Sequence, residues 1–131
     1  MELKRVVVTG LGAITPLGKT LTETWEGLVN GKSGAGPITH FDASKFKTQF
    51  ACEVKNFDPT QYFDRKEARK LDRYAQFALI AADEAIADSG MEMEKLDLNK
   101  VGVIFSSGIG GISTFQEEVE NYDVERGPRF N

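Results

Sequence analysis

The chain has 131 residues, of which 40% are hydrophobic and 27% are charged, a balance typical of a globular domain and not of a disordered or fibrous protein. The single cysteine, Cys52, excludes an internal disulfide and a cysteine-cluster metal site, and the single histidine, His40, excludes paired-histidine zinc ligands. We therefore expect no metal. The net charge of −4 argues against binding of nucleic acid by the surface as a whole.

Hydropathy along the chain predicts a cytoplasmic protein. The longest apolar run, residues 77–82, is far shorter than the roughly 20 residues that a membrane helix needs. The first residues pair two basic side chains with only three valines, which does not resemble the apolar centre of a signal peptide. We expect no membrane association.

The first predicted elements are a strand and a helix. Residues 5–9 contain three consecutive valines and lead into Gly-Leu-Gly, which is typical of a central parallel strand buried on both faces. Thr20 and Glu23 then have the spacing of a capping box at a helix N-terminus. The apolar positions of this helix recur at helical spacing up to Gly31; they are Leu21, Trp25, Leu28 and Val29.

Residues 48–54 change to a period of two, which predicts a strand with one wetter face, near the edge of a sheet. Cys52 lies on the apolar face of this strand, next to Glu53. A reactive cysteine needs a partly exposed, electropositive setting, so we expect Cys52 to be buried and unreactive. His40 lies in the preceding loop, and no catalytic partner for it can be identified.

The second half of the chain continues the alternation of helices and strands. Asp64 and Glu67 give a second capping signal, and an alanine-rich helical region runs from there through about residue 72 to Gly90. Its small side chains predict close approach of a neighbouring helix or sheet. Residues 101–105 predict another buried strand, and 113–122 a polar helix. This pattern indicates an α/β fold with a mainly parallel sheet.

Two glycine-rich turns invite comparison with nucleotide-binding motifs. Residues 10–15, Gly-Leu-Gly-Ala-Ile-Thr, place Thr15 where the dinucleotide fingerprint has its third glycine, and no acidic residue ends a second strand at the required distance. A tight strand-to-helix turn is favoured, and a Rossmann-type dehydrogenase stays a weaker alternative. Residues 106–111, SSGIGG, lack the ending of a phosphate loop, so their glycines are expected to permit unusual backbone angles.

Basic side chains are concentrated at residues 65–73, RKEARKLDR, which contain five basic and two acidic residues in an otherwise acidic chain. Lys66, Arg69 and Lys70 are spaced to share one face of a helix, where cations in the first turns oppose the helix dipole. The plain alternative is a solvated face with Glu67 and Asp72 as partners. The functional prediction is a docking site for an acidic partner.

Taken in order, the motifs of the chain resemble those of one known family. They are RVVVTGLGAITPLG at 5–18, a W-x-x-L helix with GKSG at 31–34, HFD at 40–42, RKEARKLDRYAQFAL at 65–79, DSG at 88–90 and SGIGG at 107–111. The series is similar to the β-ketoacyl-[acyl-carrier-protein] synthases, particularly the type II elongating enzyme of bacterial fatty-acid synthesis. It extends over essentially all 131 residues.

The resemblance implies a thiolase-like layered fold, a homodimer, and a decarboxylative Claisen condensation that extends an acyl thioester with malonyl-carrier protein. No metal or organic cofactor is implied. The family's nucleophile is a cysteine in a T-A-C-[ST]-G motif, assisted by two histidines, and Cys52 does not match that motif. We therefore expect residues 1–131 to be the N-terminal portion of such a domain, with no catalytic residue and no activity alone. The sequence ends at 127–131, just after a turn signal, which agrees with a break in a longer chain.

The resemblance also implies two binding roles. Lys66, Arg69 and Lys70 match the basic docking site for the acidic acyl-carrier protein, and Ile109 matches the side chain that gates the acyl pocket, with Gly108 beside it. Ser106 departs from the glycine expected at its position. The alternatives are a carrier-protein-binding module that needs no nucleophile and a polyketide-type ketosynthase.

Overall fold

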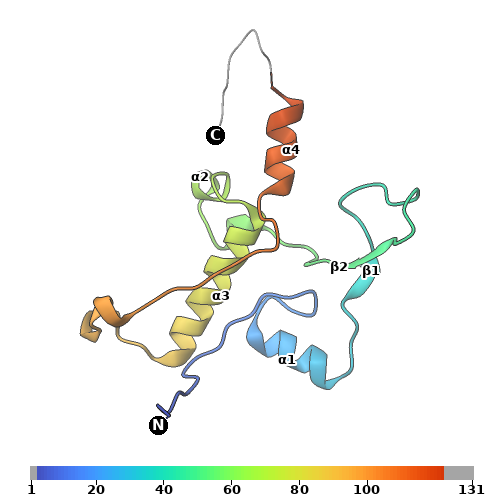
Figure 1. Cartoon of the computed structure of the whole chain (residues 1–131). Coiled ribbons are helices and arrows are strands. Elements are labelled where there is room, and N and C mark those ends of the chain that lie inside the picture. Colours follow the sequence, from blue (N-terminus) through green and yellow to red (C-terminus); the bar gives the residue numbers. More distant parts are fainter. Residues whose placement is uncertain (1–2, 123–131) are drawn as a thin grey trace. The chain divides into compact units, whose positions relative to one another are not determined.

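The computed structural model describes residues 3–122 of the chain. Its helices and strands are α1 (Leu21–Val29), β1 (Ala35–Pro37), β2 (Phe50–Cys52), α2 (Arg65–Ala68), α3 (Arg73–Ser89) and α4 (Ile112–Glu120), with short 3-10 turns at Pro59–Gln61, Met93–Lys95 and Leu98–Lys100 (Figure 1). The chain divides into two compact units. Of the described residues, the first unit contains 3–57 and 80–95, and the second contains 58–79 and 96–122.

Helix α1 begins where its capping signal predicts. The Thr20 hydroxyl accepts a hydrogen bond from the Glu23 amide at 3.2 Å. The Glu23 carboxylate accepts from the amide of Lys19 at 2.6 Å, one residue before the partner that a capping box uses. The predicted apolar side of the helix does not pack in the described residues: Trp25 is 64% exposed, and the buried positions are Thr24 and Gly27.

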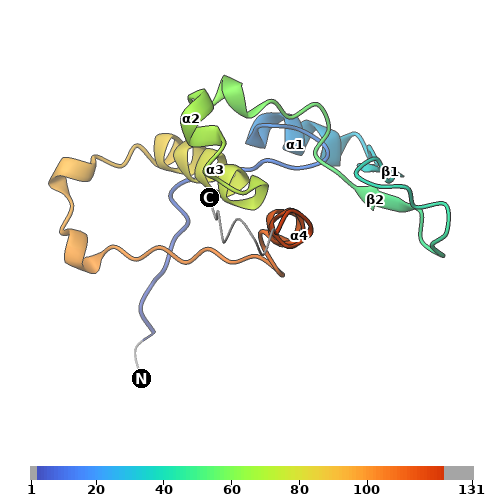
Figure 2. The same cartoon turned by 90° about the horizontal axis from the view of Figure 1, so that it is seen from above.

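Strands β1 and β2 form an antiparallel hairpin in the first unit (Figures 1 and 2). Ala35 pairs with Cys52 and Pro37 with Phe50, and the Ile38 amide extends the ladder to the carbonyl of Gln49 at 3.1 Å. The predicted strand at 48–54 is thus confirmed at its centre. The predicted burial of Cys52 is wrong, because its side chain is exposed: nothing in residues 3–122 covers that face of the two-stranded sheet.

The predicted helical region 64–89 is two helices with a break between them. The Asp64 carboxylate caps α2 by accepting from the amides of Lys66 at 2.7 Å and Glu67 at 3.0 Å. Helix α2 ends at Ala68 and α3 begins at Arg73. Gln76, which is 6% exposed, spans the break, since its side-chain amide donates to the carbonyls of Ala68 at 2.8 Å and Leu71 at 3.0 Å.

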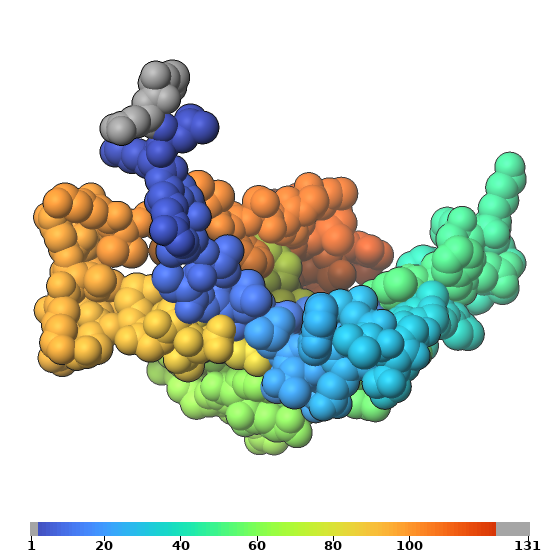
Figure 3. Space-filling view, turned by 90° about the horizontal axis from the view of Figure 1, so that it is seen from below, coloured from blue at the N-terminus to red at the C-terminus, as the bar shows by residue number. Residues whose placement is uncertain are grey.

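The predicted strands at 5–9 and 101–105 are not formed. Val6 is 88% exposed and Ile104 is 99% exposed, and neither segment pairs with another strand among the described residues. Residues 3–8, dark blue in Figure 3, stand out as a stretched segment. A strand exists only with a neighbour to complete its hydrogen bonds, so the mainly parallel sheet is absent from this part of the chain.

Apolar burial in residues 3–122 is slight. The buried apolar side chains are Ala43 and Ile80, and no large side chain in these residues is fully buried. Many apolar side chains are therefore available for contacts beyond the described structure. No helix among the described residues is both long and apolar enough to cross a membrane.

Candidate functional site

The 107–111 loop of the second unit leads directly into α4. Gly110 has φ +62° and Gly111, the N-cap residue of α4, has φ +61°. Side-chain-bearing residues rarely adopt this left-handed region, so the prediction that these glycines permit unusual backbone angles is confirmed. Ile109 is 79% exposed, and a Cβ at Gly108 would meet no atom within 4 Å. The acyl-binding role of both residues stays a prediction.

The side chains of Asp72, just before α3, and Tyr74, in its first turn, contact this loop. A Cβ at Gly111 would lie 2.7 Å from the Asp72 carboxylate, and one at Gly110 would lie 3.1 Å from the ring of Tyr74. The Thr114 hydroxyl in α4 donates a hydrogen bond to the other carboxylate oxygen of Asp72. The backbone angle is the firm requirement for both glycines; a Cβ at Gly111 would also displace the Asp72 carboxylate, and one at Gly110 would press on the Tyr74 ring. Sequence reasoning missed this role of Asp72 and assigned it to the basic segment as a local ion partner.

The basic patch, defined as Lys66, Arg69 and Lys70, is exposed in the same unit. Only Lys66 lies inside α2; Arg69 is its C-cap residue, and the Lys70 amide donates to the carbonyl of Glu67 at 2.9 Å. The prediction that all three lie on one regular helix is wrong in this detail, because the helix ends at Ala68. In a helix of four residues the first and last turns coincide, so the predicted opposition to the helix dipole does not apply.

Within residues 3–122, the three side chains of the basic patch form no ion pair. Asp72, expected to be one of its partners, binds Thr114 instead. This arrangement favours a docking surface over a patch neutralised within the chain.

The segment predicted to form a tight turn, residues 10–15, is held on α3 in the first unit. The Asp88 carboxylate accepts from the amide of Leu11 at 2.9 Å, and Glu84 accepts from the amide of Ala13 at 2.8 Å. A Cβ at Gly12 would lie 2.0 Å from the carbonyl oxygen of Ala81 in α3. The tight turn forms at Thr15–Gly18, where the two residues exchange backbone hydrogen bonds of 2.8 and 3.2 Å, and not at the two glycines. The predicted close approach to the small residues of α3 is found, but the segment that approaches is this irregular one and not a helix or sheet.

The same contacts argue against dinucleotide binding at this segment. A pyrophosphate is held by free backbone amides, whereas two amides of the segment already donate to Asp88 and Glu84. Those carboxylates would also repel phosphate. The Rossmann-type alternative is therefore disfavoured by the structure as well as by Thr15.

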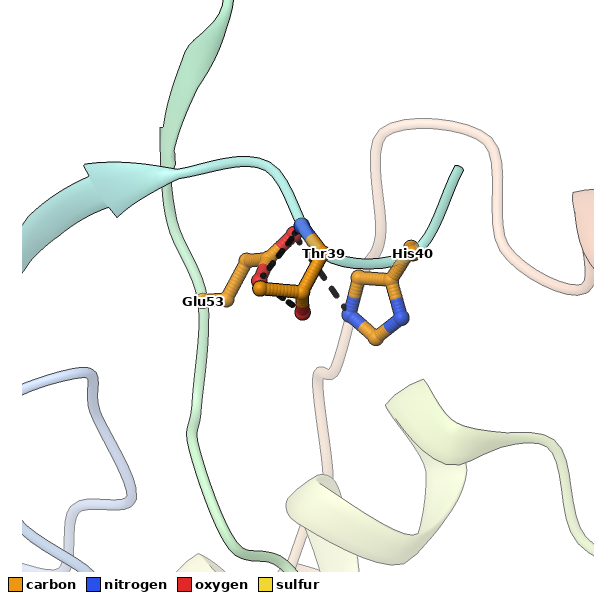
Figure 4. Close-up of polar contacts among 3 residues, drawn as sticks. All are labelled: Thr39, His40 and Glu53. Atoms are coloured by element: carbon orange, nitrogen blue, oxygen red, sulfur yellow. Dashed lines mark hydrogen bonds and ion pairs between the residues drawn. The ribbon is translucent and has the colours of Figure 1, made fainter. Parts of the chain in front are cut away.

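His40 is turned toward Glu53 beside the hairpin (Figure 4). Its Nε2 lies 3.9 Å from Glu53 Oε1, while Thr39 donates to the same carboxylate from its hydroxyl at 2.7 Å and its amide at 3.0 Å. The Thr39 hydroxyl, then the Thr39 amide, and to a smaller extent His40, lower the pKa of Glu53. The described residues contain no group of three or more metal-ligating side chains.

Comparisons with known proteins agree with the motifs described above. The sequence model of the family described as "Beta-ketoacyl synthase, N-terminal domain" matches residues 3–130. The chain is 47% identical to the 3-oxoacyl-[acyl-carrier-protein] synthase 2 of Synechocystis sp. over 98% of its length, and 47% identical to that of Coxiella burnetii, also over 98%. It is 40% identical to the protein of that name from Staphylococcus aureus over 96% of its length. The chain spans about 30% of these relatives.

Solved ketosynthases resemble the chain in structure. The ishigamide ketosynthase/chain length factor superposes with a TM-score of 0.60 and 38% identity, covering 69% of this chain and 22% of that one. A complex of a type II polyketide acyl-carrier protein with its ketosynthase gives 0.51 and 24% identity, covering 70% and 23%. Both of these structures contain a ketosynthase. Because the family match extends over nearly the whole sequence, the chain belongs to the β-ketoacyl synthase family, within its N-terminal domain.

Proposed function

We propose that residues 1–131 are the N-terminal portion of a 3-oxoacyl-[acyl-carrier-protein] synthase that elongates fatty acids. The observation that carries this proposal is the 47% identity, over 98% of the chain, to proteins of that name. The reaction joins an acyl thioester to malonyl-carrier protein. Carbon dioxide leaves the malonyl group, the resulting carbanion attacks the acyl carbonyl, a carbon–carbon bond forms and the carbon–sulfur bond of the acyl thioester breaks.

In this proposal the catalytic nucleophile and its two histidines lie outside residues 1–131. The exposed Cys52 sits in an Ala-Cys-Glu context beside a carboxylate, which does not favour a thiolate, so it takes no catalytic role. The protein is a cytoplasmic homodimer that needs no cofactor. The exposure of Val6 and Ile104 supports a thiolase-like, mainly parallel sheet that is completed when 5–9 and 101–105 pair with strands of the whole protein.

The function of the described segment is substrate presentation. The basic patch binds the acidic acyl-carrier protein, since three exposed cations that form no ion pair within residues 3–122 attract an acidic surface. Gly108 and Ile109 line the acyl pocket: Ile109 is free to meet an apolar chain, and Gly108 lets the backbone approach it. A polyketide-type ketosynthase is a second candidate, favoured by the likeness to the ishigamide ketosynthase.

The docking role is tested by reversing Lys66, Arg69 and Lys70 to Glu in the complete protein and measuring carrier affinity against salt. We expect the affinity to fall at least tenfold at low ionic strength, and the difference from wild type to shrink above about 0.5 M salt because screening removes the attraction. The matched control reverses three exposed lysines elsewhere, Lys32, Lys45 and Lys47. Equal affinity of the patch variant and this control would refute the docking role.

The activity itself is tested by supplying acyl-thioester and malonyl-carrier protein to the complete protein. One round of extension with release of one carbon dioxide supports the fatty-acid synthase. Repeated extension of an unreduced chain would support the polyketide-type enzyme instead. Binding of the carrier protein without any condensation would reject both enzymes and support a carrier-protein-binding module.

A further inference from the structure

The stretch from α2 to the first turn of α3 carries both the basic patch and the residues that contact the 107–111 loop. Residues 66–70 present the basic patch, and Asp72 and Tyr74 seat the 107–111 loop. Gln76 ties the backbone between these positions by donating to the carbonyls of Ala68 and Leu71. One short stretch of backbone therefore supports both the patch and the loop that contains Ile109.

The carboxylate of Asp72 is the polar link in this arrangement. Its Oδ1 accepts from the hydroxyl of Thr114, and its Oδ2 would lie 2.7 Å from a Cβ at Gly111. Gly111 gives α4 no side-chain cap, so this carboxylate, provided by the residue just before α3, lies beside a helix N-terminus, where negative charge is stabilising. In Figure 1 α4 begins close to the first turn of α3.

We infer that Asp72 is a positioning residue that fixes the 107–111 loop, and thereby Ile109, through its hydrogen bond to Thr114. The part of this inference that concerns acyl specificity rests on the proposed function, because it requires Ile109 to face the acyl chain. The anchoring itself does not. With the link broken, the loop gains freedom although neither the patch nor Ile109 has changed.

The test compares Thr114→Val with Thr114→Ser in the complete protein. Valine keeps the branched shape and removes the hydroxyl donor, whereas serine keeps the donor. Ser113→Ala removes the neighbouring hydroxyl of the same helix as the matched control. Hydrogen–deuterium exchange of peptides covering 105–112 reports the loop, and the ratio of extension rates for long and short acyl substrates reports specificity.

We expect Thr114→Val to speed exchange of the loop amides by several-fold, up to about tenfold, the range that loss of one hydrogen bond gives. We also expect it to change the long-to-short ratio at least threefold, with Thr114→Ser and Ser113→Ala close to wild type. Unchanged exchange in Thr114→Val overturns the anchoring, whatever the activity. The specificity role is overturned if Thr114→Val exchanges its loop amides faster but keeps the wild-type long-to-short ratio, while Ile109→Phe changes that ratio.

The companion variant Ile109→Phe separates this inference from the proposed function. It should reduce extension of long acyl chains more than short ones, since the larger ring fills the pocket. If it lowers extension equally at all lengths, the proposed acyl role of Ile109 fails. The exchange data then still decide whether Asp72 anchors the loop.

Discussion

The carboxylate of Glu84 in α3 accepts a hydrogen bond from the backbone amide of Leu21, the first residue of α1, at 2.8 Å. Its second oxygen accepts from the amide of Ala13, also at 2.8 Å. One side chain thus holds both ends of the segment from Ala13 to α1. Both oxygens accept from backbone amides. The strength of the two hydrogen bonds therefore depends on the charge of the carboxylate and on its having two equivalent acceptor oxygens.

Glu84→Gln is expected to destabilise the complete protein by about 2–4 kcal/mol, although glutamine has nearly the same size. Glutamine offers one acceptor oxygen, and its amino group would face an N–H that also donates, so one charge-assisted bond is weakened and the other is lost. Urea unfolding measures the change. Asp83→Asn, at an exposed neighbouring position of the same helix, is the control and should change the free energy by less than about 0.5 kcal/mol. A loss no larger than this control would show that the two amides are satisfied without Glu84.

Gly12→Ala is expected to destabilise the protein by about 3 kcal/mol or more. The new methyl group would lie 2.0 Å from the carbonyl oxygen of Ala81, which is backbone and cannot move aside without shifting α3. Gly31→Ala is the comparison, since Gly31 has φ +63° but no atom within 4 Å of a Cβ, and should cost about 1–2 kcal/mol from the backbone angle alone. Thermal unfolding ranks the two variants, and the reverse order would be inconsistent with the close approach of Gly12 to α3.

Glu53 should contribute stability that depends on pH. Its pKa is lower in the folded chain than its ordinary value of 4.5, chiefly because the Thr39 hydroxyl donates to the carboxylate. The folded state therefore binds fewer protons than the unfolded state, so the contribution is fully present above pH 4.5 and is lost as the pH falls through the lowered pKa. Thr39→Val should raise the pKa of Glu53 toward 4.5, as followed by NMR titration of its carboxyl carbon. Thr48→Val, two residues before β2, is the control that should leave the pKa of Glu53 unchanged.

Gln76→Met is expected to weaken carrier binding three- to tenfold at low salt without removing any charge from the basic patch. Methionine fills a similar volume but leaves the carbonyls of Ala68 and Leu71 without their donor, so the turn that presents Arg69 and Lys70 loosens. Titration with acyl-carrier protein measures the effect. Gln116→Met, an exposed position of α4, should bind like wild type, and equal binding by both variants would mean that the turn holds its shape without Gln76.

The sequence predicts best those features that are decided within one turn of the chain. Thr20 and Asp64 were expected to begin helices, and each accepts the capping hydrogen bonds that this position requires. The small residues of α3 and the glycines of the 107–111 loop were likewise understood from local chemistry. The family and its function class followed from motifs in order, since several short segments together are far more specific than any one of them.

The features that sequence reasoning missed depend on residues far apart. Asp72 and Thr114 are 42 positions apart, and nothing in the local pattern of either indicates the bond between them. The strands at 5–9 and 101–105 have the composition of strands but no neighbour among the described residues, since composition gives a preference and only pairing gives a strand. The burial of Cys52 was wrong for the same reason, because a face is buried only where a second layer covers it.

The stretch at 101–105, Val-Gly-Val-Ile-Phe, has a consequence for how the segment behaves outside its enzyme. It combines high β-propensity with no charge, and the side chains of Val103, Ile104 and Phe105 are mostly exposed. Such stretches recruit identical stretches from other copies, edge to edge, when their own sheet is not assembled. These residues would therefore promote aggregation between copies of an isolated segment, and the charged substitution Ile104→Lys should keep that segment dispersed.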